Sequence, residues 1–468
     1  MSFDTQQSQL IAEFFSIVRK FSQMGFRNKA SFVKNPLHRK DFKSYKIKLT
    51  GFLPPEAEKD EWGLDLPTRP HHDLVFYFAP GRVNLLGEHL DYNGGLVLPC
   101  AINLGCYGGA LADADTELCS FTTLSRAGTP RPYTIPYPII KNHRRIVINK
   151  NPGWYNLPLA VIKSLGHFGY VPPVPFHFAL TSSLPSGAGL GSSAALEMVL
   201  ASSLNALFSW HLSPTDLAQI CQHAENQYGD VQCGIMDQMT VALGRSREVL
   251  VLQTSDMAYG HLPLDLPDLC LLGINSRVHR KLSTTPYNQR TQEAAAALAQ
   301  IQDAYPAYPD LAHIPLEDWA QVSKIFQNKR DITLKRRARH CITEQNRCIL
   351  AQEALGGFDY ASFGRLMTAS HFSLKNDYEV SCPELDFLVE TALSSDACLG
   401  ARLTGAGFGG MTIHLVKQNK VEAFKAYMTE CYEEQFGIQP NIYLLEPSNG
   451  LAEMTYEISP WPEETDLC

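Results

Sequence analysis

A change of periodicity around a glycine-rich loop, between residues 176 and 207, most constrains the folds open to this chain. Residues 176–180 (FHFAL) alternate apolar and other side chains with period two, which predicts a strand. The loop that follows carries several glycines, so its backbone can turn tightly and approach a ligand without a Cβ in the way. Beyond the loop a helix is predicted, because apolar residues recur on one helical face at Leu196, Val199, Leu200, Leu204 and Leu207.

The start of this predicted helix is suited to binding an anion. Ser192 and Ser193 are residue types that cap helices well. The first-turn amides of a helix have no internal partner and carry roughly half a positive charge. The loop, LPSGAGLGSS, is not a Walker A loop and matches GxGxxG poorly, so neither familiar nucleotide motif applies. We interpret it as a phosphate-binding loop; the alternative is a loop that only turns the chain before a capped helix.

A second stretch, FAPGRVNLLGEHLDYNGG at residues 78–95, gathers polar side chains between glycines. It places Arg82, Glu88, His89 and Asp91 within ten residues. So many hydrogen-bonding groups, at a point where a strand should turn, make this stretch a candidate binding site. The alternative interpretation is a polar turn with internal hydrogen bonds.

Length and composition restrict the class of protein. A chain of 468 residues exceeds a single compact core, so two lobes are expected. The net charge of −8 argues against general nucleic-acid binding. The twelve cysteines form no CxxC pair, and the N-terminus lacks the pattern of a secretory signal. No apolar run approaches ~18 residues, so we expect no membrane span and a cytoplasmic protein with reduced thiols.

Residues 1–70 are interpreted as an N-terminal extension, partly helical, with helical periodicity over residues 10–21. Basic residues crowd residues 19–48, either as a docking surface or, as we favour, as a solvated face. His71-His72-Asp73 resembles a metal-ligand cluster, but three adjacent residues are a weak signal and we do not assign a site. The run KRRARH at residues 335–340 is read as part of a helix rather than as a nucleic-acid contact.

The remaining pattern mixes strands and helices without regular alternation, which predicts an α+β chain. A long helix is expected from residue 335 to Gly356-Gly357. Ser381 and Glu384 match a capping box before another helix. Residues 401–416 (ARLTGAGFGGMTIHLV) predict a strand, a glycine loop and a second strand.

Several motifs resemble those of one kinase superfamily. PSGAGLGSSAA resembles the phosphate-binding motif of the GHMP kinases, which phosphorylate galactose, homoserine, mevalonate and phosphomevalonate. APGRVNLLGEHLDYNGG resembles the signature of the galactokinase branch. Further segments resemble galactokinase in the same order, from about Phe78 to past Gly410: CGIMDQM, NSRVHRKLSTTPYNQR, RRARHCITEQNR, DYEVSCPELDFLV and GARLTGAGFGG.

The resemblance implies the two-lobed GHMP kinase fold, with an N-terminal lobe at residues 71–255, a C-terminal lobe at 256–468 and the active site in the cleft between them. It implies ATP-dependent phosphorylation of D-galactose at its anomeric hydroxyl, giving α-D-galactose 1-phosphate and ADP. The sugar would be bound by Glu88, His89, Asp91, Gly234 and Tyr287. ATP would be bound by Gly187, Ala188, Gly189, Leu190, Gly191, Ser192 and Ser193.

Asp237 in CGIMDQM is expected to accept the proton of the anomeric hydroxyl or to orient that hydroxyl, and the sequence leaves both roles open. Arg82 would keep Asp237 ionised and stabilise charge on the transferring phosphoryl group. The Mg²⁺ that accompanies ATP prefers oxygen ligands, and the resemblance assigns it to Ser193 and Glu225. Glu225 as an ordinary surface acid is the alternative. The glycines of the loop at residues 404–410 are expected to support the site.

Two positions depart from the galactokinase pattern. Leu90 replaces a threonine, and we expect its side chain to point away from the sugar. Gly191 replaces a serine, as in mevalonate kinases, which removes one hydroxyl. Rival hypotheses are a kinase for N-acetylgalactosamine, arabinose or galacturonate, and a catalytically silent sensor of galactose and ATP. We expect a monomer whose partners are a small sugar and ATP, without nucleic acid or membrane.

Overall fold

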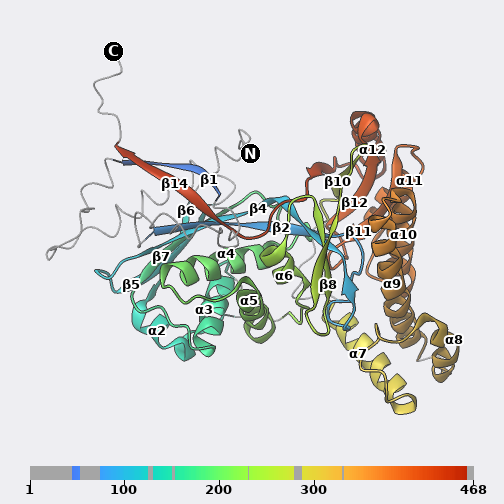
Figure 1. Cartoon of the computed structure of the whole chain (residues 1–468), viewed down its shortest axis with the longest axis horizontal. Helices are drawn as coiled ribbons and strands as arrows, with labels where there is room; N and C mark the ends of the chain where they lie inside the picture. The colour runs from blue at the N-terminus through green and yellow to red at the C-terminus, as the bar shows by residue number, and fades with distance from the viewer. Residues whose placement is uncertain are drawn as a thin grey trace, which may run out of the picture.

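The structure is a computed structural model, described here for residues 45–52, 74–124, 130–149, 153–229, 231–278, 287–328 and 331–460. It contains three sheets flanked by helices, arranged in two lobes side by side (Figure 1). The predicted helix at 10–21 and the His71-His72-Asp73 cluster lie outside the described residues. Among the helices that are described, none combines the length and apolar character needed to cross a membrane.

The largest sheet has seven strands in the order β1-β14-β2-β4-β7-β5-β6, and only β5 and β7 run parallel. The alternating stretch that the sequence predicts as a strand is β7. The C-terminal strand β14 returns to this sheet and pairs with β1 and β2. The strands are β1 (Tyr45–Phe52), β2 (Leu74–Asn84), β4 (Pro99–Ala112), β5 (Leu118–Leu124), β6 (Pro130–Pro136), β7 (Phe176–Ser182) and β14 (Ala452–Pro460).

Helices cover one face of this sheet, drawn below it in Figure 1. The predicted helix after the glycine loop is α4, which packs against β2 and β4 and is almost entirely buried. Helices α3 and α5 form a further layer against α4, so α4 is buried on most sides. These helices are α2 (Tyr137–Lys141), α3 (Asn156–His167), α4 (Ser192–Leu207), α5 (Pro214–Tyr228) and α6 (Met236–Leu243).

The second lobe is built on a four-stranded antiparallel sheet in the order β11-β12-β10-β13. Its strands are β10 (Leu269–Asn275), β11 (Cys398–Thr404), β12 (Met411–Lys417) and β13 (Asn441–Leu445). A smaller sheet contains β3 (Leu96–Val97), β8 (Glu248–Gln253) and β9 (Tyr259–Pro263). The helices are α7 (Tyr287–Ala304), α8 (Trp319–Val322), α9 (Ile332–Gly356), α10 (Tyr360–Ser373), α11 (Pro383–Leu393) and α12 (Val421–Phe436).

The strand–loop–strand prediction at residues 401–416 is confirmed by β11 and β12, and the long helix ending at Gly356 by α9. Two capping predictions are wrong. Helix α4 has Gly191 as its N-cap, in a left-handed conformation, so Ser192 and Ser193 already lie within the helix. Helix α11 has Cys382 as its N-cap without a side-chain bond, because Ser381 Oγ instead donates to Asp386 Oδ1 at 2.5 Å.

Candidate active site

One cavity of about 290 Å³ gathers the segments that the sequence singled out. Its volume is near the lower end of the usual range for small-molecule sites, about 300–1,000 Å³. Two glycine loops contribute to its wall, the first at residues 187–193 and the second at residues 404–410. The polar stretch after β2 and the start of α6 contribute as well. The predicted residues on the wall are Arg82, Glu88, His89, Asp91, Gly187, Gly189, Leu190, Gly191, Ser192, Ser193, Glu225, Gly234, Asp237 and Tyr287.

Arg82 connects three parts of this cavity. It lies near the end of β2, where its Nε and Nη2 atoms contact Asp237 Oδ1 and Oδ2 at 2.7 and 2.6 Å. Its Nη1 atom donates to the carbonyl of Gly189 at 2.5 Å, within the first glycine loop. Burial lowers the pKa of Arg82, but the carboxylates of Asp237 and Glu88 raise it more, so the guanidinium stays charged. The pair is a two-pronged ion pair of fixed geometry.

Asp237 stands in the first turn of α6, where a carboxylate interacts favourably with the helix dipole. It faces Gly191, the N-cap of α4. A Cβ built on Gly191 would lie 3.1 Å from Arg82 Cγ and 3.5 Å from Asp237 Oδ2, and Gly191 has φ +69°. Glycine at this position therefore fits both the left-handed backbone and the close approach of the ion pair.

The two glycine loops are interlocked. A Cβ on Gly405 would lie 2.7 Å from the carbonyl oxygen of Gly189, and a Cβ on Gly410 would lie 3.0 Å from that of Ala188. The side chain of Ala188 is buried in the core and is absent from the cavity wall described above. If the loop binds a phosphate as predicted, Ala188 contributes only its backbone atoms. The second loop fixes the shape of the first, as its predicted supporting role requires.

Glu88 is 1% exposed, and its carboxylate is held from several sides. Asn84 Nδ2 donates to Oε2 at 2.6 Å, and the backbone N–H of Gly405 donates to Oε1 at 2.6 Å. Arg402, which is fully buried, places Nη2 3.5 Å from Oε1. Burial raises the pKa of Glu88, although Arg402 and Arg82 act in the opposite direction. Glu88 therefore joins β2, the polar stretch and the second glycine loop.

Asp91 lies on the opposite side of the wall, next to Gly234. Burial, and then the charges of Asp237 and Glu88, raise the pKa of Asp91 to about 7. A Cβ on Gly234 would lie 2.3 Å from Asp91 Oδ2. The backbone of Gly234 thus touches the carboxylate directly, and only a hydrogen side chain allows this contact.

We predict that Gly234→Ala impairs binding in this cavity through Asp91. The new methyl group has to displace the carboxylate, since a 2.3 Å approach is impossible for non-bonded atoms. For galactose, the substrate that the resemblance implies, the expected result is an increase of at least tenfold in KM, corresponding to about 1.4 kcal/mol. Steady-state kinetics check it. Gly260→Ala is the matched control, because a Cβ at Gly260 meets no atom within 4 Å; equal effects of both variants contradict the prediction.

His89 and Tyr287 close the cavity on a third side. His89 is 4% exposed and has a left-handed backbone with φ 64°. Burial lowers the pKa of His89 well below its usual value, and His340 and Arg290 lower it further, so the ring is neutral. Its Nε2 atom is buried without a hydrogen-bond partner. Leu90, the first departure noted above, is fully buried against Gly95 and is not part of the wall, as expected.

Glu225 lies on α5 beside the helix start at Ser193. Burial raises the pKa of Glu225, while hydrogen bonds from Ser193 and Cys233 lower it. Gln238 Nε2 donates to Glu225 Oε2 at 3.0 Å and lies 3.3 Å from Glu197 Oε2. Burial and then Glu225 raise the pKa of Glu197 well above its usual value, which makes it a neutral acid behind the wall.

Sequence reasoning missed the residues that hold the polar stretch from behind. Arg402 donates to the carbonyls of Leu403 and Leu85 at 2.9 Å each. Glu344 on α9 accepts from the backbone N–H of Gly87 at 3.0 Å. A signal existed for Arg402, since a lone arginine within an apolar strand pattern is costly to bury unless it is paired. Glu344 lies in a helix rich in charges, and nothing local distinguishes it.

Comparisons with known protein families now decide the assignment. Residues 156–245 match the model for the GHMP kinases N terminal domain and residues 351–434 that for the GHMP kinases C terminal region. Residues 69–110 match the galactokinase galactose-binding signature. A galactokinase from Staphylococcus carnosus is 36% identical over 377 residues, which is 81% of this chain and 94% of that protein. The chain belongs to the galactokinase family.

Other galactokinases and solved structures agree with this assignment. A galactokinase from Bacillus subtilis is 35% identical over 384 residues, covering 82% of this chain and 95% of that protein. The crystal structure of Lactococcus lactis galactokinase complexed with galactose has a TM-score of 0.74 at 33% identity, covering 81% and 94% of the two chains. A Methanococcus jannaschii mevalonate kinase shares the fold, with a TM-score of 0.54 at 19% identity, covering 82% and 100%. The predicted α+β GHMP kinase fold is confirmed.

Proposed function

We propose that this galactokinase family member transfers the γ-phosphoryl group of ATP to the anomeric hydroxyl of D-galactose, giving α-D-galactose 1-phosphate and ADP. The observation that carries the proposal is the two-pronged Arg82–Asp237 pair, bound to the first glycine loop through the carbonyl of Gly189. Asp237 and the loop that suits a phosphate line the same cavity.

Asp237 is placed to receive the proton of the attacking hydroxyl. Both of its oxygens accept from Arg82, but a carboxylate has about four lone-pair sites, so each oxygen can accept a second hydrogen bond. Arg82 pairs with both oxygens of Asp237 and offers positive charge near the transferring group. Phosphoryl transfer passes through a loose transition state, in which alignment and charge stabilisation supply most of the catalysis.

Ser193 and Glu225 fit the needs of the Mg²⁺ that accompanies ATP. The Ser193 side chain already hydrogen-bonds Glu225, so two hard oxygen donors meet at the wall of the cavity. Mg²⁺ keeps several waters and binds phosphates, and one or two protein oxygens are sufficient for it. When bound, the ion would neutralise charge on the nucleotide phosphates. Gln238 and Cys233 hold Glu225 in place through their bonds to Oε2.

Glu88, His89, Asp91, Gly234 and Tyr287 line the part of the cavity next to Asp237, and we assign the sugar to them. Carboxylates accept hydrogen bonds from hydroxyl groups, and a buried site that pairs each hydroxyl rejects sugars that lack one. The Lactococcus lactis relative was crystallised with galactose, and this supports galactose over the other candidate sugars.

An assay of ADP release across galactose, N-acetylgalactosamine, arabinose, galacturonate and glucose tests the proposal. We expect galactose to give the highest kcat/KM. A higher value with any other sugar would overturn the substrate assignment. Binding of galactose and ATP without ADP release would instead favour a silent sensor.

The Kd for galactose is predicted to rise as the pH falls below about 7. The pKa of Asp91 is about 7 in the free protein, because burial and the nearby Asp237 and Glu88 disfavour its charge. The ionised form accepts hydrogen bonds from the sugar, so protonation at lower pH weakens binding. Isothermal titration with galactose between pH 5.5 and 8.5 measures this directly. The Asp91→Asn variant should bind weakly with a flat profile; an unchanged profile in that variant would assign the titration to another group.

A further inference from the structure

We propose that Tyr92 and Tyr378 are positioning residues that fix the tautomer of His89, so that its Nε2–H presents a hydrogen-bond donor, and not an acceptor, to the substrate. This inference rests on the proposed function, in which His89 contacts the sugar. It assigns a specificity role to two tyrosines that no comparison above singles out. The argument depends on the chain of polar contacts behind the His89 ring.

The His89 ring has one nitrogen turned toward the protein and one that is unpartnered. Nδ1 lies 2.7 Å from the Tyr92 hydroxyl, which in turn lies 3.0 Å from the Tyr378 hydroxyl. Nε2 is buried and makes no hydrogen bond of good geometry, although the backbone of Ala406, which lines the same cavity, contacts the ring and acts to raise its pKa. A buried nitrogen left unpaired is costly, so this atom is a natural contact for a substrate hydroxyl.

The direction of the hydrogen bonds follows from the chemistry of the partners. A neutral imidazole nitrogen is a stronger acceptor than a phenol oxygen, so the Tyr92 proton goes to His89 Nδ1 rather than to Tyr378. The shorter of the two contacts agrees with this choice. A neutral histidine has a single N–H, so an accepting Nδ1 leaves the proton on Nε2.

Asn93 favours the same donor-to-acceptor direction at the other end of this series of hydrogen bonds, at Tyr378. Its Nδ2 atom lies 2.6 Å from the carbonyl oxygen of His89, which can only accept, so the amide orientation is fixed. The same nitrogen lies 3.4 Å from the Tyr378 hydroxyl, as a weak donor. The Tyr378 proton is then available to the Tyr92 oxygen; the sulfur of Cys341, which also contacts the Tyr378 hydroxyl, is a weak acceptor.

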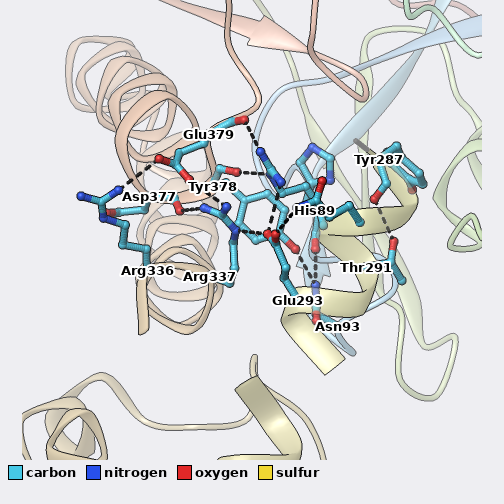
Figure 2. A network of polar contacts seen from close by, with 12 residues as sticks. His89, Asn93, Tyr287, Thr291, Glu293, Arg336, Arg337, Asp377, Tyr378 and Glu379 are labelled. Carbon is cyan, nitrogen blue, oxygen red and sulfur yellow. Dashed lines mark hydrogen bonds and ion pairs between the residues drawn. The ribbon is translucent and has the colours of Figure 1, made fainter. Parts of the chain in front are cut away.

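Tyr378 is held rigidly from both ends, which suits a positioning residue. Its ring contacts those of His89 and His340, with centroids 4.8 and 4.6 Å away and ring planes tilted by 35° and 44°. Its carbonyl accepts from Arg290 Nε at 2.7 Å, one turn beyond Tyr287 on α7. Figure 2 shows the charged network around it, which joins α7 to α9 and to the turn after Tyr378.

The arginines of the KRRARH run belong to this network. Arg337 is 1% exposed and contacts Glu293 Oε2 at 2.7 Å and Glu379 Oε2 at 2.8 Å. Its Nη1 atom donates to the carbonyl of Asp377 at 2.5 Å. Arg336 pairs with Glu379 (Figure 2). Arg339 pairs with Asp377. The backbone on both sides of Tyr378 is thus anchored by buried or partly buried ion pairs.

The first experiment measures Tyr92→Phe, Tyr378→Phe and the double variant with galactose. Tyr92→Phe should raise the KM for galactose about tenfold, the effect of one hydrogen bond, and leave kcat within about twofold, because Asp237 and Arg82 are untouched. The double variant should be close to Tyr92→Phe, since Tyr378 acts through Tyr92. Tyr137→Phe is the matched control, as its hydroxyl bonds the carbonyls of Pro172 and Pro173 far from the cavity. A parallel fall of kcat in all three variants would contradict the proposal.

The second experiment determines whether His89 donates. Fluorine accepts a hydrogen bond but has no proton to donate, whereas a deoxy sugar does neither. Deoxy and deoxyfluoro galactoses are compared at each hydroxyl-bearing carbon other than C1, in the wild type and in His89→Ala. At the position where His89→Ala abolishes the deoxy penalty, the fluoro sugar should bind the wild type several-fold better than the deoxy sugar. Equal binding of the two analogues would mean that Nε2 accepts, and would overturn the inference.

The third measurement needs no activity. Nitrogen NMR of histidine-labelled protein without substrate reports the tautomer, with the His89 signal assigned through His89→Ala. We expect the Nε2–H form in the wild type and a mixture of both forms in Tyr92→Phe. An Nδ1–H form in the wild type would reject the relay even if galactose is a good substrate. If the wild type shows the expected Nε2–H tautomer but releases no ADP with galactose, only the proposed function would be rejected.

Discussion

Asp237→Asn is expected to lower kcat with galactose by at least 10²-fold, within the range of about 10²–10⁴ typical of a positioned general base. The amide cannot accept the proton of the anomeric hydroxyl. It also breaks the ion pair, since its Nδ2 atom would face one of the two Arg82 nitrogens that now contact the carboxylate at 2.7 and 2.6 Å. ATP binding should persist, because the phosphate loop has its own backbone contacts with the second glycine loop.

The rate of phosphorylation is measured in a single turnover with saturating galactose. The affinity for ATP is measured separately by titration. Asp303→Asn, on the exposed surface of α7, is the matched control. Near-wild-type turnover in Asp237→Asn would reject the assignment. Loss of ATP binding along with turnover would show that the variant has disturbed the loop through Arg82, and the effect would then not report on proton transfer.

The local elements were largely predictable, because their signals are local. The period-two run at residues 176–180 and the helical face from Leu196 to Leu207 each reflect burial of one side of one element. The glycine loops were predictable for the same reason, since a left-handed backbone at Gly187, Gly189 and Gly191 is a property of each residue.

The caps were not predictable in the same way, because several side chains compete for one position. Ser192 is a good capping residue, but the close approach of Arg82 and Asp237 favours glycine at position 191, and the helix starts one residue earlier than a cap at Ser192 would place it. Ser381 is likewise drawn to Asp386 and leaves the helix end to Cys382. Tertiary contacts decided both ends.

The site was predictable in part. Residue type and spacing pointed to Arg82 and Asp237, which lie 155 positions apart, only because each stands in a recognisable motif. The motifs do not indicate which groups meet behind these two residues. Tyr92 and Tyr378 each lie inside a motif quoted above, yet nothing in either motif indicates that their hydroxyls come within 3.0 Å across 286 positions. Local sequence patterns cannot predict which residues far apart in the chain will form such a pair.

The division into residues 1–70, 71–255 and 256–468 stays a prediction. The return of β14 to the seven-stranded sheet shows why sequence order is a poor guide to lobes, since the last described strand joins the first lobe. The same return places β13 and β14, only a few residues apart, in different sheets. A boundary drawn once along the chain cannot describe such a path.

The largest effect on stability is expected for Glu344→Gln. Glu344 is fully buried on α9, where it accepts from Arg347 Nε at 2.6 Å, from Ser370 Oγ at 2.5 Å and from the backbone N–H of Gly87 at 3.0 Å. Burial raises the pKa of Glu344, but Arg347, His340 and Arg402 lower it more, and the net value is about 2. Against an ordinary value of 4.5, the ionised carboxylate contributes roughly 3 kcal/mol to the free energy of unfolding.

The sign of the pH dependence follows from the depressed pKa. The stabilisation is fully present above pH 4.5, the ordinary pKa of the group, and is lost as the pH falls from there through about 2. Urea unfolding at pH 7 should therefore show Glu344→Gln less stable than the wild type by about 3 kcal/mol, and the gap should narrow below pH 4.5. The Glu353→Gln variant, exposed on the same helix, should unfold like the wild type. A gap that stays constant down to pH 3 would mean that Glu344 stabilises the protein by packing rather than by its charge. Glu344 holds Gly87 at the start of the turn to which we assign the sugar. The KM for galactose should therefore rise in Glu344→Gln even at pH 7, where the protein remains folded.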